Sequence, residues 1–311
     1  MRFTQLLFSF FALLALFTSA CTQTEDKGAV QTGERMKIVT TTSILKDAVV
    51  NIIGDAADVE AIMGSGVDPH LYKATQGDLQ KLTNADVVVY NGLHLEGKMG
   101  EVLEKLSRQK TVLAGAESIA EDKLRRSPQF QDSHDPHIWF DVMLWKEVVQ
   151  HLSEEFQKKD PANAAVYKQN SAAYLKQLDE LNQWVSQEIA SIPENQRILI
   201  TAHDAFGYFG DAYKIDVRGL QGISTVSEFG LQDVASLVNY IAQNKIKAVF
   251  VESSVSPKAI EAVVIGSEQK GHNVKIGGTL YSDALGEDGT PEGTYIGMVR
   301  HNVNTIVSSL K

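Results

Sequence analysis

The tripeptide Asp-Pro-His occurs twice in this 311-residue chain, and it is the pattern that points most directly to chemistry. His70 follows Asp68-Pro69, and His137 follows Asp135-Pro136. Because proline restricts the backbone next to each imidazole, less conformational freedom would be lost when the rings bind a ligand. Imidazole is a common ligand of zinc and also serves manganese, so the repeated motif favours a metal site.

Two further residues stand where predicted strands end. His203 ends a strand that begins at Ile198, and Asp283 follows a strand that ends at Leu280. In open α/β sheets ligands bind outside the carboxyl ends of the strands, so two ligands from each half of the chain would converge on one crevice. Spacing alone also allows four ordinary surface or core side chains, because positions so far apart form no local motif of the Cys-x-x-Cys type.

Other polar residues near these positions have weaker arguments. Asp141 and Asp204 follow candidate histidines closely, so each could orient an imidazole or serve as a plain helix cap or surface acid. Glu228 and Glu252 are acids of the second half that could lie near the crevice, and Trp139 is expected to pack beside the second motif. We predict that the five other histidines are not ligands: His94, His134, His151, His272 and His301.

Composition excludes several other classes of protein. The formal net charge is −10, and removal of residues 1–20, which hold one arginine and no acid, makes it −11. An acidic chain of this kind is not expected to bind nucleic acid. The sequence contains no Gly-x-Ser-x-Gly elbow, and Gly219–Gly222 lacks the context of a phosphate-binding loop.

The elements that must position these residues alternate between strand and helix, which indicates an α/β fold with mostly parallel sheets. In the first half we predict strands at residues 37–42, 59–63, 86–91 and 111–114, and helices at 44–53 (capped by Ser43), 76–82, 98–106 and 142–158. In the second half we predict strands at 197–201, 217–220, 247–251 and 274–280, and helices at 231–244, 257–269 and 292–310.

One long helix separates the two halves. Asp160 can cap its start, Pro161 suits the first helical position, and Pro193 marks its end. Between them, apolar residues recur at helical spacings, at Tyr167, Tyr174, Leu178, Leu181, Val185, Ile189 and Ile192. The pattern predicts about 30 residues of helix, about 48 Å long at 1.5 Å per residue.

The N-terminus has the pattern of a lipoprotein signal. Arg2 supplies a positive charge, residues 6–17 are mostly apolar, and small residues precede Cys21, the one cysteine of the chain. The apolar run is too short to span a bilayer comfortably. We therefore predict a signal peptide at residues 1–20, lipidation of Cys21, and a polar flexible tether at residues 21–35.

Several motifs together resemble one known family, that of the TroA-like zinc and manganese solute-binding lipoproteins of ABC importers. The motifs cover nearly the whole mature chain, as Gly66-Val-Asp-Pro-His-Leu-Tyr72, Asn91-Gly-Leu-His-Leu-Glu96, Asp135-Pro-His-Ile-Trp-Phe-Asp141, Thr201-Ala-His-Asp-Ala-Phe-Gly-Tyr-Phe209, Gly219-Leu-Gln-Gly-Ile-Ser224 and Leu280-Tyr-Ser-Asp283. The resemblance implies two α/β lobes, at residues 36–159 and 194–311, joined by one rigid helix at 160–193. It also implies that His70, His137, His203 and Asp283 are the metal ligands.

The same resemblance implies a carrier and not an enzyme. Its cargo would be one Zn²⁺ or Mn²⁺ ion, bound between the lobes and delivered to a membrane permease with a cytoplasmic ATPase. The protein would be a monomer, anchored by lipid on the periplasmic or cell-surface side of a membrane. The alternatives are a metal-dependent hydrolase, which would need an open coordination position and a nearby base, and a surface adhesin.

Two sequence features point to different metals. Zinc-specific members of the family often carry a His-rich loop before the second ligand, and residues 117–133 contain no histidine. Stricter manganese binders tend to have glutamate at the position of His203. Since a nitrogen-rich site favours zinc in the Irving–Williams order, we expect both metals to bind, with zinc tighter.

Overall fold

The computed structural model describes residues 35–127, 133–227 and 229–311. The predicted signal peptide, the lipidation site Cys21, nearly all of the tether, and Glu228 lie outside the described residues. Residues 35–311 form one compact unit. Arg35, which we expected in the tether, belongs to this unit and donates a hydrogen bond of 2.6 Å to the backbone oxygen of Asp55. Among the described residues, no helix has both the length and the apolar character needed to cross a membrane.

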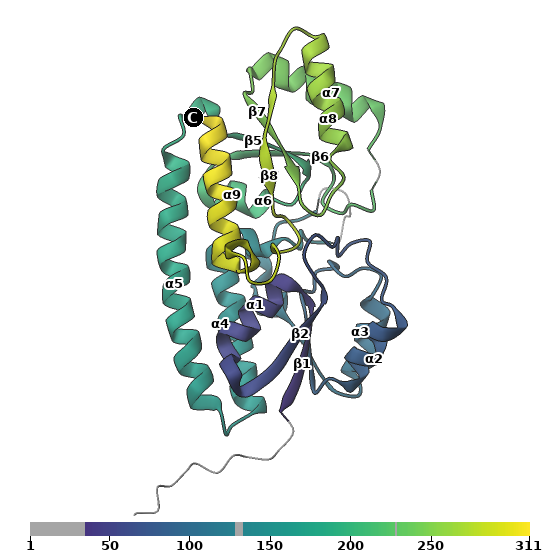
Figure 1. Cartoon of the computed structure of the whole chain (residues 1–311), viewed down its shortest axis with the longest axis vertical. Helices are drawn as coiled ribbons and strands as arrows, with labels where there is room; N and C mark the ends of the chain where they lie inside the picture. The colour runs from purple at the N-terminus through teal and green to yellow at the C-terminus, as the bar shows by residue number, and fades with distance from the viewer. Residues whose placement is uncertain (1–34, 128–132, 228) are drawn as a thin grey trace, which may run out of the picture. The chain divides into compact units, whose positions relative to one another are not determined.

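The first half of the unit is a parallel four-stranded sheet with helices on both faces (Figure 1). Its strands, in the order β2-β1-β3-β4, are β1 (Met36–Thr42), β2 (Ala57–Met63), β3 (Val87–Tyr90) and β4 (Thr111–Ala114). Its helices are α1 (Ser43–Ile53), α2 (Gln76–Asn84), α3 (Gly100–Ser107) and α4 (Val142–Lys159). Ile38 packs with α1 and α4, while Val39 faces α2 and α3, because successive strand residues point to opposite faces.

The second half repeats the α/β pattern with two parallel strand pairs. They are β5 (Ile198–His203) with β6 (Asp216–Gln221), and β7 (Ala248–Glu252) with β8 (Lys275–Leu280); β5 also contacts β7. The helices are α6 (Gly207–Tyr213), α7 (Leu231–Asn244), α8 (Lys258–Gln269) and α9 (Tyr295–Leu310). The short helix α6 was not predicted.

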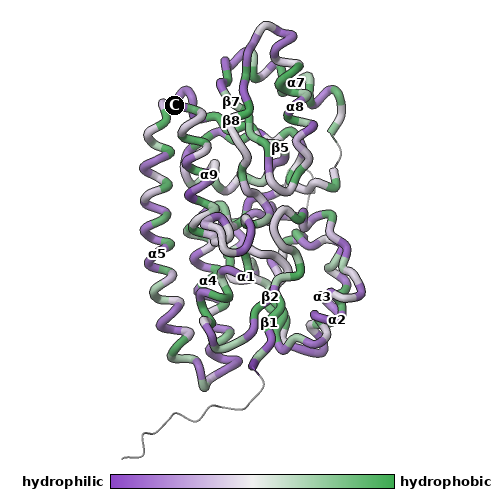
Figure 2. The backbone as a smooth tube through the Cα atoms, in the orientation of Figure 1, coloured by the Kyte–Doolittle hydropathy of each residue, from purple (hydrophilic) through white to green (hydrophobic). Residues whose placement is uncertain are grey.

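Helix α5 (Ala164–Ala190) contacts α1 and α4 of the first half and α6 and α9 of the second. It alternates hydrophobic and hydrophilic positions along its length (Figure 2). The predicted start at Asp160-Pro161 is wrong, because Asp160 ends α4 and its carboxylate accepts hydrogen bonds from Asn163 and Tyr167, both at 2.7 Å. The 27-residue helix is therefore about 40 Å long at 1.5 Å per residue, shorter than predicted.

The two halves share one hydrophobic core and several direct hydrogen bonds. A single cluster of buried residues runs from Ile38 in β1 to Leu310 in α9. The predicted cap of α1, Ser43, is instead its first residue, and Thr42 caps the helix. The hydroxyl of Ser43 accepts a hydrogen bond of 3.0 Å from the backbone N–H of Leu285, in the loop after β8. These contacts fix the loops that carry the candidate site.

Candidate metal centre

The four candidate ligands lie at or beyond the carboxyl ends of four strands. His70 lies in the loop after β2, His137 in the long segment after β4, His203 is the last residue of β5, and Asp283 follows β8 by three residues. All four side chains are buried, with exposed fractions of at most 3%. The structure thus brings together residues that are far apart in the sequence, two from each half.

Their ligand atoms have the spacing of a metal site. One atom from each residue can be chosen so that all four lie within 4.8 Å of one another. The Nε2 atoms of His70 and His137 are 3.3 Å apart, and the Nε2 atoms of His137 and His203 lie 3.4 and 3.5 Å from the two carboxylate oxygens of Asp283. A tetrahedron with zinc bonds of about 2.0–2.1 Å has edges of about 3.3–3.4 Å, so the first two of these separations match it and the third is slightly longer.

The repeated Asp-Pro-His motif forms the same turn twice. Asp68 accepts a hydrogen bond of 2.8 Å from the backbone N–H of His70, and Asp135 accepts one of 3.0 Å from that of His137. An aspartate that bonds the backbone two residues later stabilises a tight turn without other secondary structure. Each histidine therefore has its backbone fixed by its own motif.

Two buried carboxylates contact the Nδ1 atoms of His137 and His203, on the opposite side of each ring from Asp283. Asp135 Oδ1 lies 2.7 Å from Nδ1 of His137, and Glu252 Oε2 lies 2.5 Å from Nδ1 of His203. Glu252 also accepts a 2.8 Å hydrogen bond from the backbone N–H of His203. A carboxylate at Nδ1 fixes the ring orientation and leaves Nε2 for the metal. This role of Asp135 was not predicted from the sequence, and Glu252 was predicted only to lie near the crevice; the spacing Asp-x-His was the visible signal for Asp135.

The charges of the site set opposite pKa directions for its histidines. Burial lowers the pKa of His70 to about 3. For His137, burial acts in the same direction, but the hydrogen bond and charge of Asp135, with Asp283, raise its pKa to about 9. For His203, the charges of Glu252 and Asp283 likewise outweigh burial and raise the pKa well above its usual range. The two histidines in turn hold the pKa of Asp283 well below its usual range, against the effect of burial.

The structure also places the three residues that were predicted to lie beside the ligands, Trp139, Asp141 and Asp204. Trp139 packs edge-on against His137, with ring centroids 5.2 Å apart, and its indole N–H donates to the backbone oxygen of Ser282 at 3.0 Å, as the packing prediction required. Asp141 caps α4 by accepting from the backbone N–H of Met143, so it does not orient an imidazole. Asp204 makes no hydrogen bond to a histidine ring within the described residues.

The five other histidines lie outside this cluster of ligand atoms. His151 is in α4, and the ring of His272 lies 2.7 Å from the backbone oxygen of Ile246. His301, in α9, has its ring 3.0 Å from the backbone oxygen of Thr279. His94 and His134 lie in loops of the first half.

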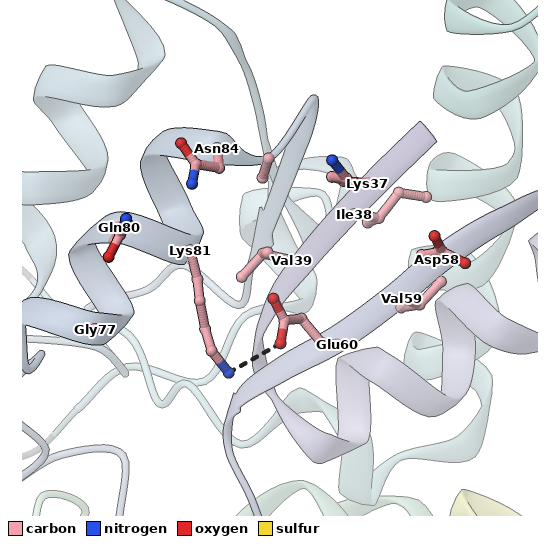
Figure 3. A pocket seen from close by; sticks show the side chains of 11 residues that line it. Lys37, Ile38, Val39, Asp58, Val59, Glu60, Gly77, Gln80, Lys81 and Asn84 are labelled. Atoms are coloured by element: carbon pink, nitrogen blue, oxygen red, sulfur yellow. Dashed lines mark ion pairs between the residues drawn. The ribbon is translucent and has the colours of Figure 1, made fainter. Parts of the chain in front are cut away.

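One cavity is remote from these residues. It has a volume of about 660 Å³ and lies between α2 and the strands β1 and β2 (Figure 3). Its polar side chains include Glu60 and Lys81, which form an ion pair of 2.9 Å, and none of the four candidate ligands lines it. It therefore adds nothing to the metal centre.

Comparison with known proteins identifies the family. Residues 38–309 match the sequence model of the family described as "Zinc-uptake complex component A periplasmic". The chain belongs to this family of zinc and manganese solute-binding proteins of ABC importers. It is 50% identical to the manganese-binding lipoprotein MntA of Bacillus subtilis (strain 168) over 98% of this chain and 97% of that protein.

A solved structure within the family has the same fold. The periplasmic zinc-binding protein TroA from Treponema pallidum superposes with a TM-score of 0.87 at 46% sequence identity, over 89% of this chain and all but 1% of that one. The fold class predicted from the sequence, two α/β lobes joined by a long helix, is confirmed by this match and by the arrangement of α5.

Proposed function

We propose that this family member captures one divalent transition metal ion, Zn²⁺ or Mn²⁺, through His70, His137, His203 and Asp283, and delivers it to an ABC importer. The observation that carries the proposal is the preformed set of four buried ligand atoms within 4.8 Å of one another. The names of relatives that bind zinc or manganese support it. The permease and its ATPase are the partners that this role requires.

The chemistry of the site suits a carrier. Four protein ligands complete the tetrahedral shell of zinc, so no coordination position is left for a substrate or a reactive water. Without a thiolate, the site can also release its metal, which a carrier must do. The two oxygens of Asp283, each facing one imidazole, can bind through one atom or both, which allows a metal that prefers more ligands than zinc.

Metal titration tests the proposal. Metal-free protein should bind one equivalent of Zn²⁺ or of Mn²⁺, with zinc the tighter in a competition assay because nitrogen ligands favour it. Asp283→Ala should abolish tight binding of both ions, whereas His272→Ala, which removes a histidine elsewhere, should leave it intact. Tight binding that survives Asp283→Ala would refute the ligand set.

The same proposal includes a lipid anchor on Cys21, which would hold the protein on the extracytoplasmic side of the cell membrane. The lipoprotein names of the relatives support it. If Cys21 carries the anchor, Cys21→Ser should move the protein from the membrane fraction to the soluble extracytoplasmic fraction. A variant that stays in the membrane would show that another segment anchors it.

A further inference from the structure

One cavity leads to the proposed ligands. It has a volume of about 280 Å³, and the proposed ligand His70 lines it. Both halves contribute to its wall, with Pro136 from the first and Ile223 and Val226 from the second. At about 30 Å³ per water it holds roughly nine water molecules, enough for a metal ion with its inner hydration shell.

Two histidines outside the ligand set line the same cavity. His94 and His134 contribute to its wall and also to a neighbouring cavity of about 440 Å³ that shares this wall. Among the described residues, neither ring makes a hydrogen bond or an ion pair, whereas His272 and His301 both contact backbone oxygens. Within the part of the chain that the structure describes, no protein group therefore occupies the ring nitrogens of these two histidines, which line the cavity.

The backbone at His94 is held in an unfavourable conformation. Gly92, Leu93 and His94 have consecutive φ angles of 87°, 52° and 66°, in the left-handed region that side chains rarely adopt. The buried carboxylate of Glu96 holds this turn, because it accepts hydrogen bonds from the backbone N–H groups of Asn91 at 2.7 Å and Gly92 at 3.3 Å. Such strain persists only where the surrounding structure enforces it, and it clusters at functional positions.

We propose that His94 and His134 form a weak capture site for a hydrated divalent transition metal, from which the ion passes to His70. The inference rests on the proposed function, since it describes the route to that site. Two imidazoles hold a metal less firmly than three imidazoles and a carboxylate, so the ion would move inward. Imidazole also disfavours Mg²⁺ and Ca²⁺, which prefer oxygen ligands, so the outer site would select the class of metal before the inner one.

The first experiment is kinetic. Zn²⁺ binding to and release from the metal-free full chain would be followed by stopped flow for the wild type, for a His94→Asn/His134→Gln double variant, and for a His151→Gln control. Asparagine is chosen at position 94 because it tolerates a positive φ. We expect the association and dissociation rate constants of the double variant to fall together, by about threefold or more, with an unchanged equilibrium affinity. Rates equal to those of the control would overturn the proposal.

The second experiment detects the outer site directly. After one equivalent of Zn²⁺ has filled the inner site, further Zn²⁺ should shift the imidazole NMR signals of His94 and His134, and the double variant should lose this weak second binding event. Tight binding of the first equivalent without any such shift would contradict the capture site and leave the proposed function intact. Failure to bind the first equivalent would instead contradict the proposed function.

Discussion

The carboxylates behind two imidazoles decide which ring nitrogen is offered to the metal. Asp135 and Glu252 each lie against an Nδ1 atom, so the Nε2 atoms of His137 and His203 face Asp283. A ring with the opposite tautomer would present an N–H to the metal and could not bind it. These acids are therefore as much a part of the site as the proposed ligands themselves.

Glu252→Gln tests this role at the best-defined position. A glutamine can still accept the hydrogen bond from the backbone of His203, but its NH₂ group would face Nδ1 and favour the wrong tautomer. Loss of a carboxylate behind a metal-binding histidine typically costs about 10–100-fold in affinity, and we expect a decrease in that range for Zn²⁺ in chelator competition. Glu104→Gln, at an exposed position of α3, is the control; an affinity within twofold of that control would contradict the role.

The pH dependence of binding follows from the raised pKa values of two histidines. In the metal-free protein at neutral pH, His137, with a pKa of about 9, and His203, whose pKa is also raised, both carry a proton. The metal must displace both protons, whereas His70, with a pKa of about 3, is already neutral. Affinity should therefore rise with pH up to about the raised pKa values, and not level off near the ordinary histidine value of about 6.5.

In numbers, two released protons correspond to an increase in the Zn²⁺ association constant of about a hundredfold per pH unit between about pH 6 and 8. Competition with a chelator, corrected for the protonation of the chelator, gives this slope directly. Calorimetry in buffers of different ionisation enthalpy counts the released protons independently. An affinity that is level above about pH 7 would show that neither histidine holds its proton as described.

At the scale of elements, strong local patterns were predicted well and tertiary contacts were not. Strand β4 and helix α7 have the predicted bounds, because β-forming residue types in the strand and helical periodicity in α7 are carried by their own residues. Helix α6 was missed because seven residues are too few to show a helical period. The start of α5 was misplaced because Asp160, a good cap by type, bonds Tyr167 in the folded chain.

In the candidate site, too, local sequence patterns could be predicted and tertiary contacts could not. The four ligand positions could be named from the repeated motif, the strand ends and the family resemblance. The contact between Glu252 and His203 could not, because it joins the ends of β5 and β7, which only the folded structure places side by side. Asp141 had the sequence proximity of an imidazole partner, yet its carboxylate is used by the first turn of α4.

A hydrogen bond between two loops closes the cleft near His70. The hydroxyl of Thr225, in the loop after β6, donates to Asp68 at 2.6 Å, and the other oxygen of Asp68 holds the backbone of His70. A hydrogen bond to a charged group contributes about 1.5 kcal/mol or more, so Thr225→Val should speed Zn²⁺ release by about tenfold. Thr225→Ser keeps the hydroxyl and should behave like wild type. Equal release rates for all three proteins, measured by stopped flow into excess chelator, would rule out this closing role.

At the scale of the whole folded unit, the structure argues against a wide hinge. Helix α5 packs on helices of both halves, and the hydrophobic core is continuous between them. Trp139 donates to the backbone oxygen of Ser282 and its own backbone oxygen accepts from Tyr295 at 2.7 Å, so the segment that carries His137 is bonded to the second half. Large hinge closure needs a few residues free to change φ and ψ, and a continuous packed helix offers none.

Metal binding should therefore change loops more than the placement of the halves. For the Cys21→Ser chain we expect the radius of gyration from solution X-ray scattering, about 19 Å for a compact unit of this size, to change by less than about 1 Å on Zn²⁺ addition. Backbone hydrogen exchange should slow in the loops that hold His70 and His137, because a bond to the metal would restrain these loops. Exchange in α5 should stay nearly constant. A change in radius of several ångströms would mean that the core contacts between the halves break during binding, and that α5 does not hold them in one arrangement.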